Sequence, residues 1–279
     1  SKSLDQLSVI AGKRVKEREY WLSRLDGSLD TLGFPYDFSV DHSDGEKGLE
    51  VVAFDVPADL VTGLEKLSTG SNVRLHMVLT AGVTALAYRY AAGALDNDIP
   101  VGDAMGIRVG SPILKPKDTG TKDFINTFLV LYQEIPAETT FKQLLLSTRE
   151  TLAGALEHQN YPVEILARDL GVPFNTGEPF PLCDCAVLVD TIHDYRLIEH
   201  LNLNMVLSFS KENSSLRGKW QFNPGLFKRS SVERLAAQLV RFLQRAVKEP
   251  DATICGIDVL SEEVKEKILV TFNETGGPY

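Results

Sequence analysis

The stretch at 72–93 constrains the fold most, because its apolar residues recur at helical spacing. These residues would share one face of a helix: Leu75, Val78, Leu79, Val83, Leu86 and Tyr90. Asn72 can cap the start of this helix, and Gly93 lies near its end. The longest apolar window, 78–95, contains Arg89 and two tyrosines, so it indicates a helix in a protein core and not a membrane span. We therefore expect a long, buried amphipathic helix.

Shorter patterns on both sides of this helix indicate helices and strands in mixed order. Helical periodicity or helix-start signals mark residues 4–25, 57–67, 140–159, 162–171 and 230–247. Thr140 with Gln143, and Ser230 with Glu233, have capping-box spacing. Strand-like runs lie at 49–56, 98–105, 125–135, 183–191, 201–210 and 216–222. A loop rich in Gly, Pro and Lys follows the second run, and residues 211–215 are expected to join the last two runs as a hairpin. We expect an α/β domain with helices packed on a mixed β-sheet.

The composition is that of an ordinary globular protein, with 43% hydrophobic and 24% charged residues among 279. The net charge of −9 and a pI near 5.1 argue against a nucleic-acid partner, which normally requires clustered basic residues. The N-terminal residues contain no apolar signal-peptide core. With three cysteines, an odd number, a disulfide framework is not expected. We expect a cytoplasmic protein without membrane or nucleic-acid partners.

A metal site is the first chemical pattern to weigh, because Cys183 and Cys185 stand near His193 and His200. Residues two apart on a strand face the same side, so both thiols would face a core, and zinc sites usually use a CxxC-type turn. We therefore expect no metal site. Glycines at every fourth residue from 102 to 110 match neither a dinucleotide fingerprint nor a P-loop, so nucleotide binding is not expected either.

Five short motifs, taken in order, carry a resemblance to a known family. They are Ile99-Pro100-Val101-Gly102, Phe124-Ile125-Asn126-Thr127, His158-Gln159-Asn160-Tyr161-Pro162-Val163-Glu164, Asn223-Pro224-Gly225-Leu226-Phe227, and Phe272-Asn273-Glu274-Thr275 ahead of Pro278-Tyr279. The chain resembles the condensation domain of nonribosomal peptide synthetases, in its C-terminal (second) lobe. The N-terminal lobe, which carries the family's HHxxxDG signature, is absent from these residues.

This resemblance implies a single chloramphenicol acetyltransferase-like lobe at 1–258. It also implies a linker helix and tail at 259–279, leading toward an adenylation domain. By family position, the site residues of the lobe are structural or line a tunnel floor: Val101, Gly102, Asp103, Phe124, Asn126, Thr127, His158, Gln159, Pro162, Glu164, Asn223, Leu226 and Phe227. Those of the linker are Phe272, Asn273, Thr275, Pro278 and Tyr279.

Several positions depart from the family pattern. Asp103 and Ala104 stand where Thr and Pro are usual, and Lys122 with Asp123 replaces Gly-Phe, which places charge where a tunnel would be apolar. Asn160 and Val163 stand where Asp and Phe are commoner. These departures weaken the expectation that the segment lines a substrate tunnel.

No catalytic residue is expected in this chain. The family base is the second histidine of HHxxxDG, and no two histidines are adjacent here. The nearest imitation, at 42–45, has one residue between His42 and Asp44 and suits a turn. His158 is interpreted as a structural residue that bonds carbonyls at the end of a helix.

The leading functional hypothesis is a non-catalytic, truncated condensation domain of peptide antibiotic biosynthesis, serving as a scaffold for the following adenylation domain in an initiation module. We then expect weak dimerisation or stabilisation by that domain. The alternative is an excised half of an active domain, completed by its missing N-terminal lobe and joining thioesters on carrier-protein domains. Phosphopantetheine would then be carried by that partner, and no cofactor would bind this chain directly. A stand-alone acyltransferase is the weakest hypothesis.

Overall fold

The centre of the molecule is a six-stranded sheet with the order β1-β6-β5-β4-β2-β3. This computed structural model describes residues 4–26, 33–39, 48–93, 104–115, 125–172 and 177–259. The strands are β1 (Glu50–Asp55), β2 (Met105–Pro112), β3 (Phe128–Ile135), β4 (Cys185–Val189), β5 (Met205–Glu212) and β6 (Ser215–Phe222). Strand β4 is parallel to β2 and β5, and the other neighbours are antiparallel. The expected α/β fold with a mixed sheet is therefore confirmed.

The two ends of the sheet are chemically different places. Because β2, β4 and β5 run in one direction, their C-terminal ends meet at one end of the sheet, here called the carboxyl end. Their first residues define the amino end, where the antiparallel strands β3 and β6 finish. The start of β3 pairs with the end of β2, so residues that precede Phe128 lie at the carboxyl end.

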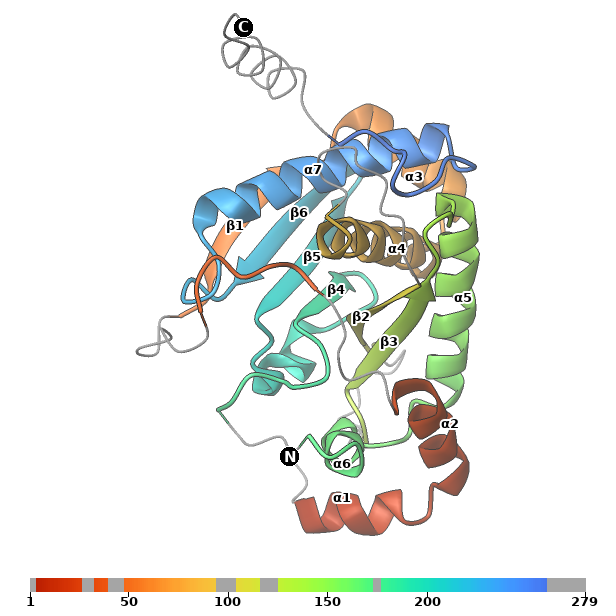
Figure 1. Ribbon diagram of the computed structural model, residues 1–279, viewed down its shortest axis with the longest axis vertical. Coiled ribbons are helices and arrows are strands. Elements are labelled where there is room, and N and C mark those ends of the chain that lie inside the picture. The colour runs from red at the N-terminus through yellow and green to blue at the C-terminus, as the bar shows by residue number, and fades with distance from the viewer. Residues whose placement is uncertain are drawn as a thin grey trace, which may run out of the picture.

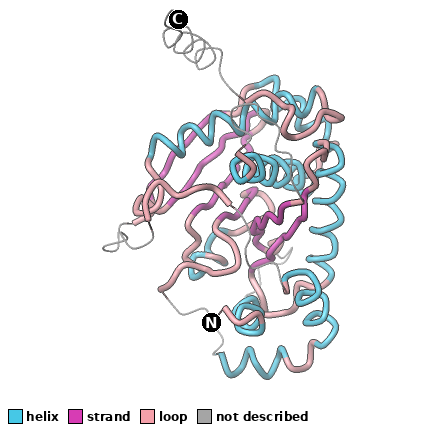
Figure 2. The backbone as a smooth tube through the Cα atoms, in the orientation of Figure 1, coloured by secondary structure: helices cyan, strands magenta, loops and turns pink. Residues whose placement is uncertain are grey.

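Helices cover the sheet on two sides (Figures 1 and 2). The larger core joins one face of the sheet to α3 (Ala58–Ser68), α4 (Asn72–Ala91), α7 (Arg229–Lys248) and the start of α5 (Phe141–Glu157). A second core lies on the other face of the sheet. It joins strands β3, β4 and β5 to the helices α1 (Leu4–Ala11), α2 (Val15–Leu25), α6 (Val163–Asp169) and the rest of α5. Two short 3₁₀ turns, η3 (Tyr195–Leu197) and η4 (Glu199–Leu201), connect β4 to β5.

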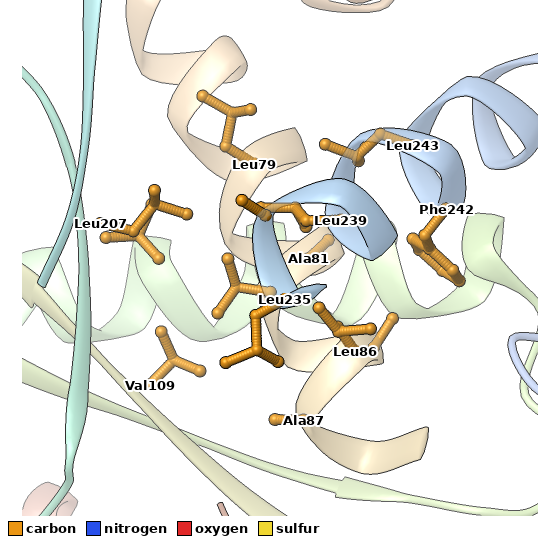
Figure 3. Close-up of a cluster of buried hydrophobic side chains, with 14 of the residues drawn as sticks. Leu79, Ala81, Leu86, Ala87, Val109, Leu207, Leu235, Leu239, Phe242 and Leu243 are labelled. Atoms are coloured by element: carbon orange, nitrogen blue, oxygen red, sulfur yellow. The ribbon is translucent and has the colours of Figure 1, made fainter. Parts of the chain in front are cut away.

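Helix α4 is buried on more than the one face that its sequence predicts. Fourteen of its twenty residues are buried, because α4 lies between the sheet and α7 (Figure 3). Gly82 allows this approach, since a Cβ there would lie 2.6 Å from Leu243 Cδ2. The helix also begins differently from the expectation: Ser71 is the N-cap and accepts from the N–H of Arg74, and Asn72 is the first helical residue.

Strand β2 occupies residues for which the sequence predicts a loop, and residues 98–103 of the expected strand lie outside the described residues. The expected run at 98–105 ends where β2 begins, and the expected loop contains most of the strand. Gly106 and Gly110 suggested a loop, yet aromatic rings of β3 lie over them. A Cβ at Gly110 would lie 2.0 Å from Phe128 Cζ, and one at Gly106 would lie 2.7 Å from Tyr132 Cε2. Cross-strand rings thus supply the packing that the glycines lack.

The helix-start predictions had mixed outcomes. The capping box of Thr140 and Gln143 is present at the start of α5. The second box, at Ser230 and Glu233, does not form, because α7 already begins at Arg229 and Glu233 pairs with that arginine at 3.1 Å. The single helix expected at 4–25 is two helices, α1 and α2, separated at Gly12.

The C-terminal part of the described chain is packed against the rest of the fold. Val259 is fully buried in the larger core. Residues 260–279 lie outside the described residues, and with them the expected linker helix at 261–272 and Phe272, Asn273, Thr275, Pro278 and Tyr279. Within the described ranges, every helix is too short or too polar to cross a bilayer.

Candidate functional site

Asn126 hydrogen-bonds both the start of β3 and the turn after α5 at the carboxyl end of the sheet. Its Nδ2 donates to the carbonyl oxygens of Phe128 at 2.7 Å and Gln159 at 3.0 Å. Its Oδ1 accepts from the N–H groups of Thr127 at 2.9 Å and Phe128 at 3.3 Å. The side chain is buried, so these bonds replace water for the start of β3 and for the turn after α5. The neighbouring Thr127 contributes its carbonyl, which accepts from Ile113 N–H at 3.1 Å.

His158 closes α5, as the sequence predicts. It is the C-cap of the helix, and its Nδ1 lies 2.9 Å from the carbonyl oxygen of Gly154, so Nδ1 carries the proton. Its ring stacks on Tyr20 of α2, with centroids 4.0 Å apart and an interplanar angle of 4°. Trp21 Nε1 donates to the carbonyl of His158 at 2.9 Å. The motif histidine therefore joins α2 to α5.

The rest of this motif begins α6 and connects it to η4. Pro162 is the N-cap residue of α6, and its carbonyl accepts from Leu166 N–H at 3.0 Å. Glu164 Oε1 lies 3.4 Å from Nε2 of His200, which belongs to η4. The structure thus brings Asn126, Thr127, His158, Gln159, Pro162 and Glu164 to one region at the carboxyl end.

The Asn223 motif forms a matching joint at the amino end, directly after β6. Asn223 Oδ1 accepts from Gly225 N–H at 2.9 Å, and its carbonyl accepts from Leu226 and Phe227 N–H at 3.1 and 3.0 Å. Leu226 and Phe227 are buried in the larger core. This turn leads the chain from β6 into α7.

Beside this joint lies a polar cluster that the sequence pattern does not indicate. Tyr36 Oη donates to Asp184 Oδ2 at 2.8 Å, and Asn204 Nδ2 donates to Asp184 Oδ1 at 2.9 Å. Burial, with the neighbouring Asp184 carboxylate, raises the pKa of Tyr36. Asp37 accepts from Lys228 N–H and from Ser231 Oγ, both at 2.8 Å. No local motif could have identified this cluster, because its hydrogen bonds join residues 148 to 194 positions apart in the sequence, except for the bond between Asp184 and Asn204, which are 20 apart.

Two histidines lie buried between α4 and the loop after β4. The rings of His76 and His193 make an edge contact with centroids 4.5 Å apart. Burial lowers the pKa of His76 to about 4, and burial with the nearby His76 and Lys115 lowers that of His193 to about 2. Both are therefore neutral at pH 7. The sequence suggests His193 only as a possible metal ligand and gives no signal for His76.

The two thiols near this region do not share a face, contrary to the expectation. Cys183 belongs to the second core and Cys185 to the larger one. Cys183 precedes the first residue of β4, so the strand alternation does not extend to it. Burial raises the pKa of both thiols, which keeps them protonated.

The remaining predicted site residues, Val101, Gly102, Asp103 and Phe124, lie outside the described residues. One groove of about 370 Å³ opens between the end of β3 and the start of α5. Its described lining includes Ile135, Pro136 and Leu144 with the acidic Glu134 and Glu138, and it contains no histidine, cysteine or basic side chain. This lining offers no base or nucleophile for thioester chemistry other than carboxylates and hydroxyls.

Comparisons with known proteins agree with this architecture. Residues 8–269 match the family model of the condensation domain. A plipastatin synthase of Bacillus subtilis is 30% identical over 94% of this chain, which spans only 7% of that protein. Tyrocidine synthase 2 of Brevibacillus parabrevis is 26% identical over 95% of this chain, which spans 8% of that protein. The chain thus corresponds to a small part of each of these relatives.

Two solved structures share the fold. The complex of the X-domain and OxyB from teicoplanin biosynthesis aligns with a TM-score of 0.71 at 16% identity, over 88% of this chain and 56% of that one. The starter condensation domain of rhizomide synthetase aligns with a TM-score of 0.59 at 20% identity, over 92% and 57%. Because the family model matches nearly the whole sequence, this chain belongs to the condensation domain family of nonribosomal peptide synthetases.

Proposed function

We propose that this chain is the non-catalytic C-terminal lobe of a condensation domain and serves as a scaffold for the following adenylation domain in an initiation module. The observation that carries this proposal is the role of the described motif side chains. Asn126, His158 and Asn223 each bond backbone groups at turns and helix ends. They support the fold, and a scaffold needs no more than that. The lobe would act in the cytoplasm, where such an assembly works on intracellular thioesters.

Amide formation from a thioester commonly uses a histidine that is both accessible and free of other bonds, and the described residues include no such histidine. The amine attacks the thioester carbonyl, the carbon–sulfur bond breaks, and the amine must lose a proton, which a histidine commonly manages. Among the described residues, His76 and His193 are buried, His158 bonds Gly154, and His200 faces Glu164. None of these four imidazoles is both accessible and unengaged.

The contacts of the segment at 250–259 support a scaffold role. Buried Arg89 donates through Nη1 to the carbonyls of Ile254 at 2.7 Å and Cys255 at 2.6 Å. Thr253 pairs with Thr140 as an isolated bridge, and Ile254 N–H donates to Thr139 O at 2.9 Å. The segment at 250–259 is thereby fixed to α4 and to the start of α5.

The test is to measure whether the adenylation domain encoded after this chain stabilises it. The two would be produced together and separately, and thermal unfolding and sedimentation would be compared. We expect a raised Tm for the joined protein and an interface of at least roughly 1,000 Å². A monodisperse monomer whose Tm is unchanged by the adenylation domain would contradict scaffolding.

A second candidate is favoured by the coverage of the solved relatives, of which this chain spans 56% and 57%. In that case the chain is half of an active domain that joins carrier-bound aminoacyl or peptidyl thioesters, and its missing lobe supplies the base. The discriminating experiment joins the chain to the residues encoded before Ser1 and supplies donor and acceptor thioesters on phosphopantetheine carriers. Amide product from the longer protein alone would replace the scaffold proposal with this one.

A further inference from the structure

His76 and His193 occupy a position that apolar packing does not explain. His76 lies on α4, and its Nε2 is 3.1 Å from the carbonyl oxygen of Val187 in β4, with Thr80 Oγ1 at 3.3 Å and Ser111 Oγ at 3.5 Å. His193 lies in the loop after β4, and its Nδ1 is 3.1 Å from the backbone nitrogen of Val189. Both side chains are almost fully buried.

The backbone partners fix the tautomer of each ring. A carbonyl oxygen can only accept, so His76 must carry a proton on Nε2. An N–H can only donate, so His193 Nδ1 must be bare, and the proton of the neutral ring lies on Nε2. That Nε2 has no hydrogen-bond partner among the described residues. A second proton on His193 would have to be placed on Nδ1, directly against the N–H of Val189.

The loop that carries His193 is held at a small number of points. Val189 O accepts from Ile192 N–H at 3.0 Å and from His193 N–H at 2.9 Å. Lys115 N–H donates to Ile192 O at 2.8 Å, and Lys115 Nζ contacts Asp190 O. The loop at 190–193 therefore contacts α4 through the imidazole rings, β5 through Asp190 N–H, which donates to Phe209 O at 3.0 Å, and the segment after β2 through Lys115.

The charged neighbours oppose protonation or are engaged elsewhere. Lys115, from the segment after β2, lowers the pKa of His193 by its positive charge. The carboxylate of Asp194, which follows His193, pairs with Arg196 at 2.7 Å. Asp190 is exposed, and its described hydrogen bonds are made by its backbone. From α4 the facing groups are His76 and Thr80, and from β2 the facing group is Ser111. No described carboxylate pairs with either imidazole.

We propose that His76 and His193 form a proton-sensitive latch, which holds the loop at 190–193 against α4 when both rings are neutral and releases it when either is protonated. Protonated His193 places an N–H against the N–H of Val189, so the side-chain bond that fixes the His193 ring to the end of β4 and beside His76 is lost. Protonated His76 places a buried charge 4.5 Å from the neighbouring ring, with no carboxylate to balance it. Release would open the carboxyl end of the sheet next to the Asn126 joint, since Ile113 bonds Thr127 there.

Two substitutions separate protonation from packing. His193→Asn places an amide oxygen where Nδ1 accepts from Val189, and His76→Gln places an amide N–H where Nε2 donates to Val187. Each keeps its backbone bond and cannot be protonated. The matched control is Thr148→Val, which breaks another buried polar pair, with Gln133 at 3.1 Å, and involves no titrating group.

The measurement is the unfolding equilibrium constant of the full chain at pH 6 and pH 5, from urea titrations. Each buried histidine should raise this constant about 7-fold over that unit, because the unfolded chain binds a proton that the folded chain excludes. The ratio of the unfolding constant at pH 5 to that at pH 6 should be about 7-fold larger in the wild type than in either single variant, and about 50-fold larger than in the double variant. Thr148→Val should keep the wild-type rise. Equal rises in wild type and both variants would overturn the proposal.

A second measurement tests that the release is local. The protection factor of the Val189 amide against hydrogen exchange should fall at least 10-fold from pH 6.5 to pH 5 in the wild type, and should stay constant in His193→Asn. The amide of Leu207, in the neighbouring strand β5, serves as the reference. An equal loss of protection at both amides would show global unfolding and would overturn the latch.

Discussion

The two ends of the sheet are held together by different kinds of buried side chain. At the amino end, two arginines donate to backbone carbonyls: Arg89 to Ile254 and Cys255, and Arg108 to Leu182 and Leu25. At the carboxyl end, two neutral histidines, His76 and His193, bond a carbonyl and an N–H of β4. Each end also carries an asparagine, Asn126 or Asn223, whose side chain bonds the backbone of a turn.

This difference shows that one fold can be held both by groups whose charge acid does not change and by groups whose charge it does change. A guanidinium keeps its charge at every accessible pH, so the amino end holds its bonds as pH falls. An imidazole changes its charge near pH 6.5 when solvated, so the carboxyl end depends on excluding protons. The bonds at the amino end hold the segment at 250–259, and those at the carboxyl end hold the loops around Asn126.

The largest expected effect comes from breaking the amino end. Arg89→Ala removes two charge-assisted bonds, leaves the carbonyls of Ile254 and Cys255 without that donor, and creates a cavity beside α4. We expect a loss of about 4 kcal/mol in the free energy of unfolding. Urea titration at pH 7 and pH 5 checks this. The loss should be the same at both pH values, and a loss confined to pH 5 would contradict the assignment of this end to permanent charge.

The next effect compares the two motif asparagines. Asn126→Ala removes four hydrogen bonds at a buried site, so we expect a loss of about 3 kcal/mol. Asn223→Ala removes one described side-chain bond at a half-buried turn, so we expect about 1 kcal/mol. Thermal or urea unfolding of both variants gives the ranking. Equal losses would show that the two joints do not differ as described.

Acid should weaken the carboxyl end by a predictable amount. The folded pKa values of His76 and His193, about 4 and about 2, lie below the usual 6.5. The unfolded chain therefore binds more protons, so the stability is present above pH 6.5 and is lost as pH falls from there toward the folded pKa, about 4 for His76 and about 2 for His193. From pH 7 to pH 5 we expect a loss of about 2 kcal/mol for each histidine. Urea titrations across this range, with Arg89→Ala as the amino-end comparison, check the value. A wild-type stability that is flat from pH 7 to pH 5 would contradict it.

The smallest expected effect concerns how α7 begins at the amino end. Asp37→Ala removes the acceptor for Lys228 N–H and for Ser231 Oγ, a contact that resembles a helix cap supplied from another segment. We expect a loss of about 1 kcal/mol. The matched control at the other capped helix is Thr140→Ala, with a similar expected loss. Differential scanning calorimetry resolves both, and an unchanged Tm in Asp37→Ala would show that the contact is not formed in solution.

Local signals explain which elements could be predicted from the sequence. The Thr140 box needs only three residues of spacing, and α4 shows a long apolar periodicity, so both were found. The position of β2 was missed, because Gly106 and Gly110 are explained only by Phe128 and Tyr132 on the partner strand.

The site followed the same rule. The structural role predicted for His158 agrees with its cap contact, which lies within one helical turn. The contact of His76 with β4, the polar cluster around Asp184 and the anchoring role of Arg89 were missed, because their partners lie from 20 to 194 residues away in the sequence. Contacts at such separations become visible only when the sheet brings the strands together.

The most direct test of the non-catalytic assignment is an amide-forming assay of this chain alone. A donor thioester and an acceptor aminoacyl thioester, each on a phosphopantetheine carrier, would be incubated with the 279-residue protein, and product would be followed by mass spectrometry. We predict no product above the protein-free rate, because the described histidines are buried or engaged. Product that forms with the wild type and disappears in His158→Gln at unchanged stability would contradict this assignment.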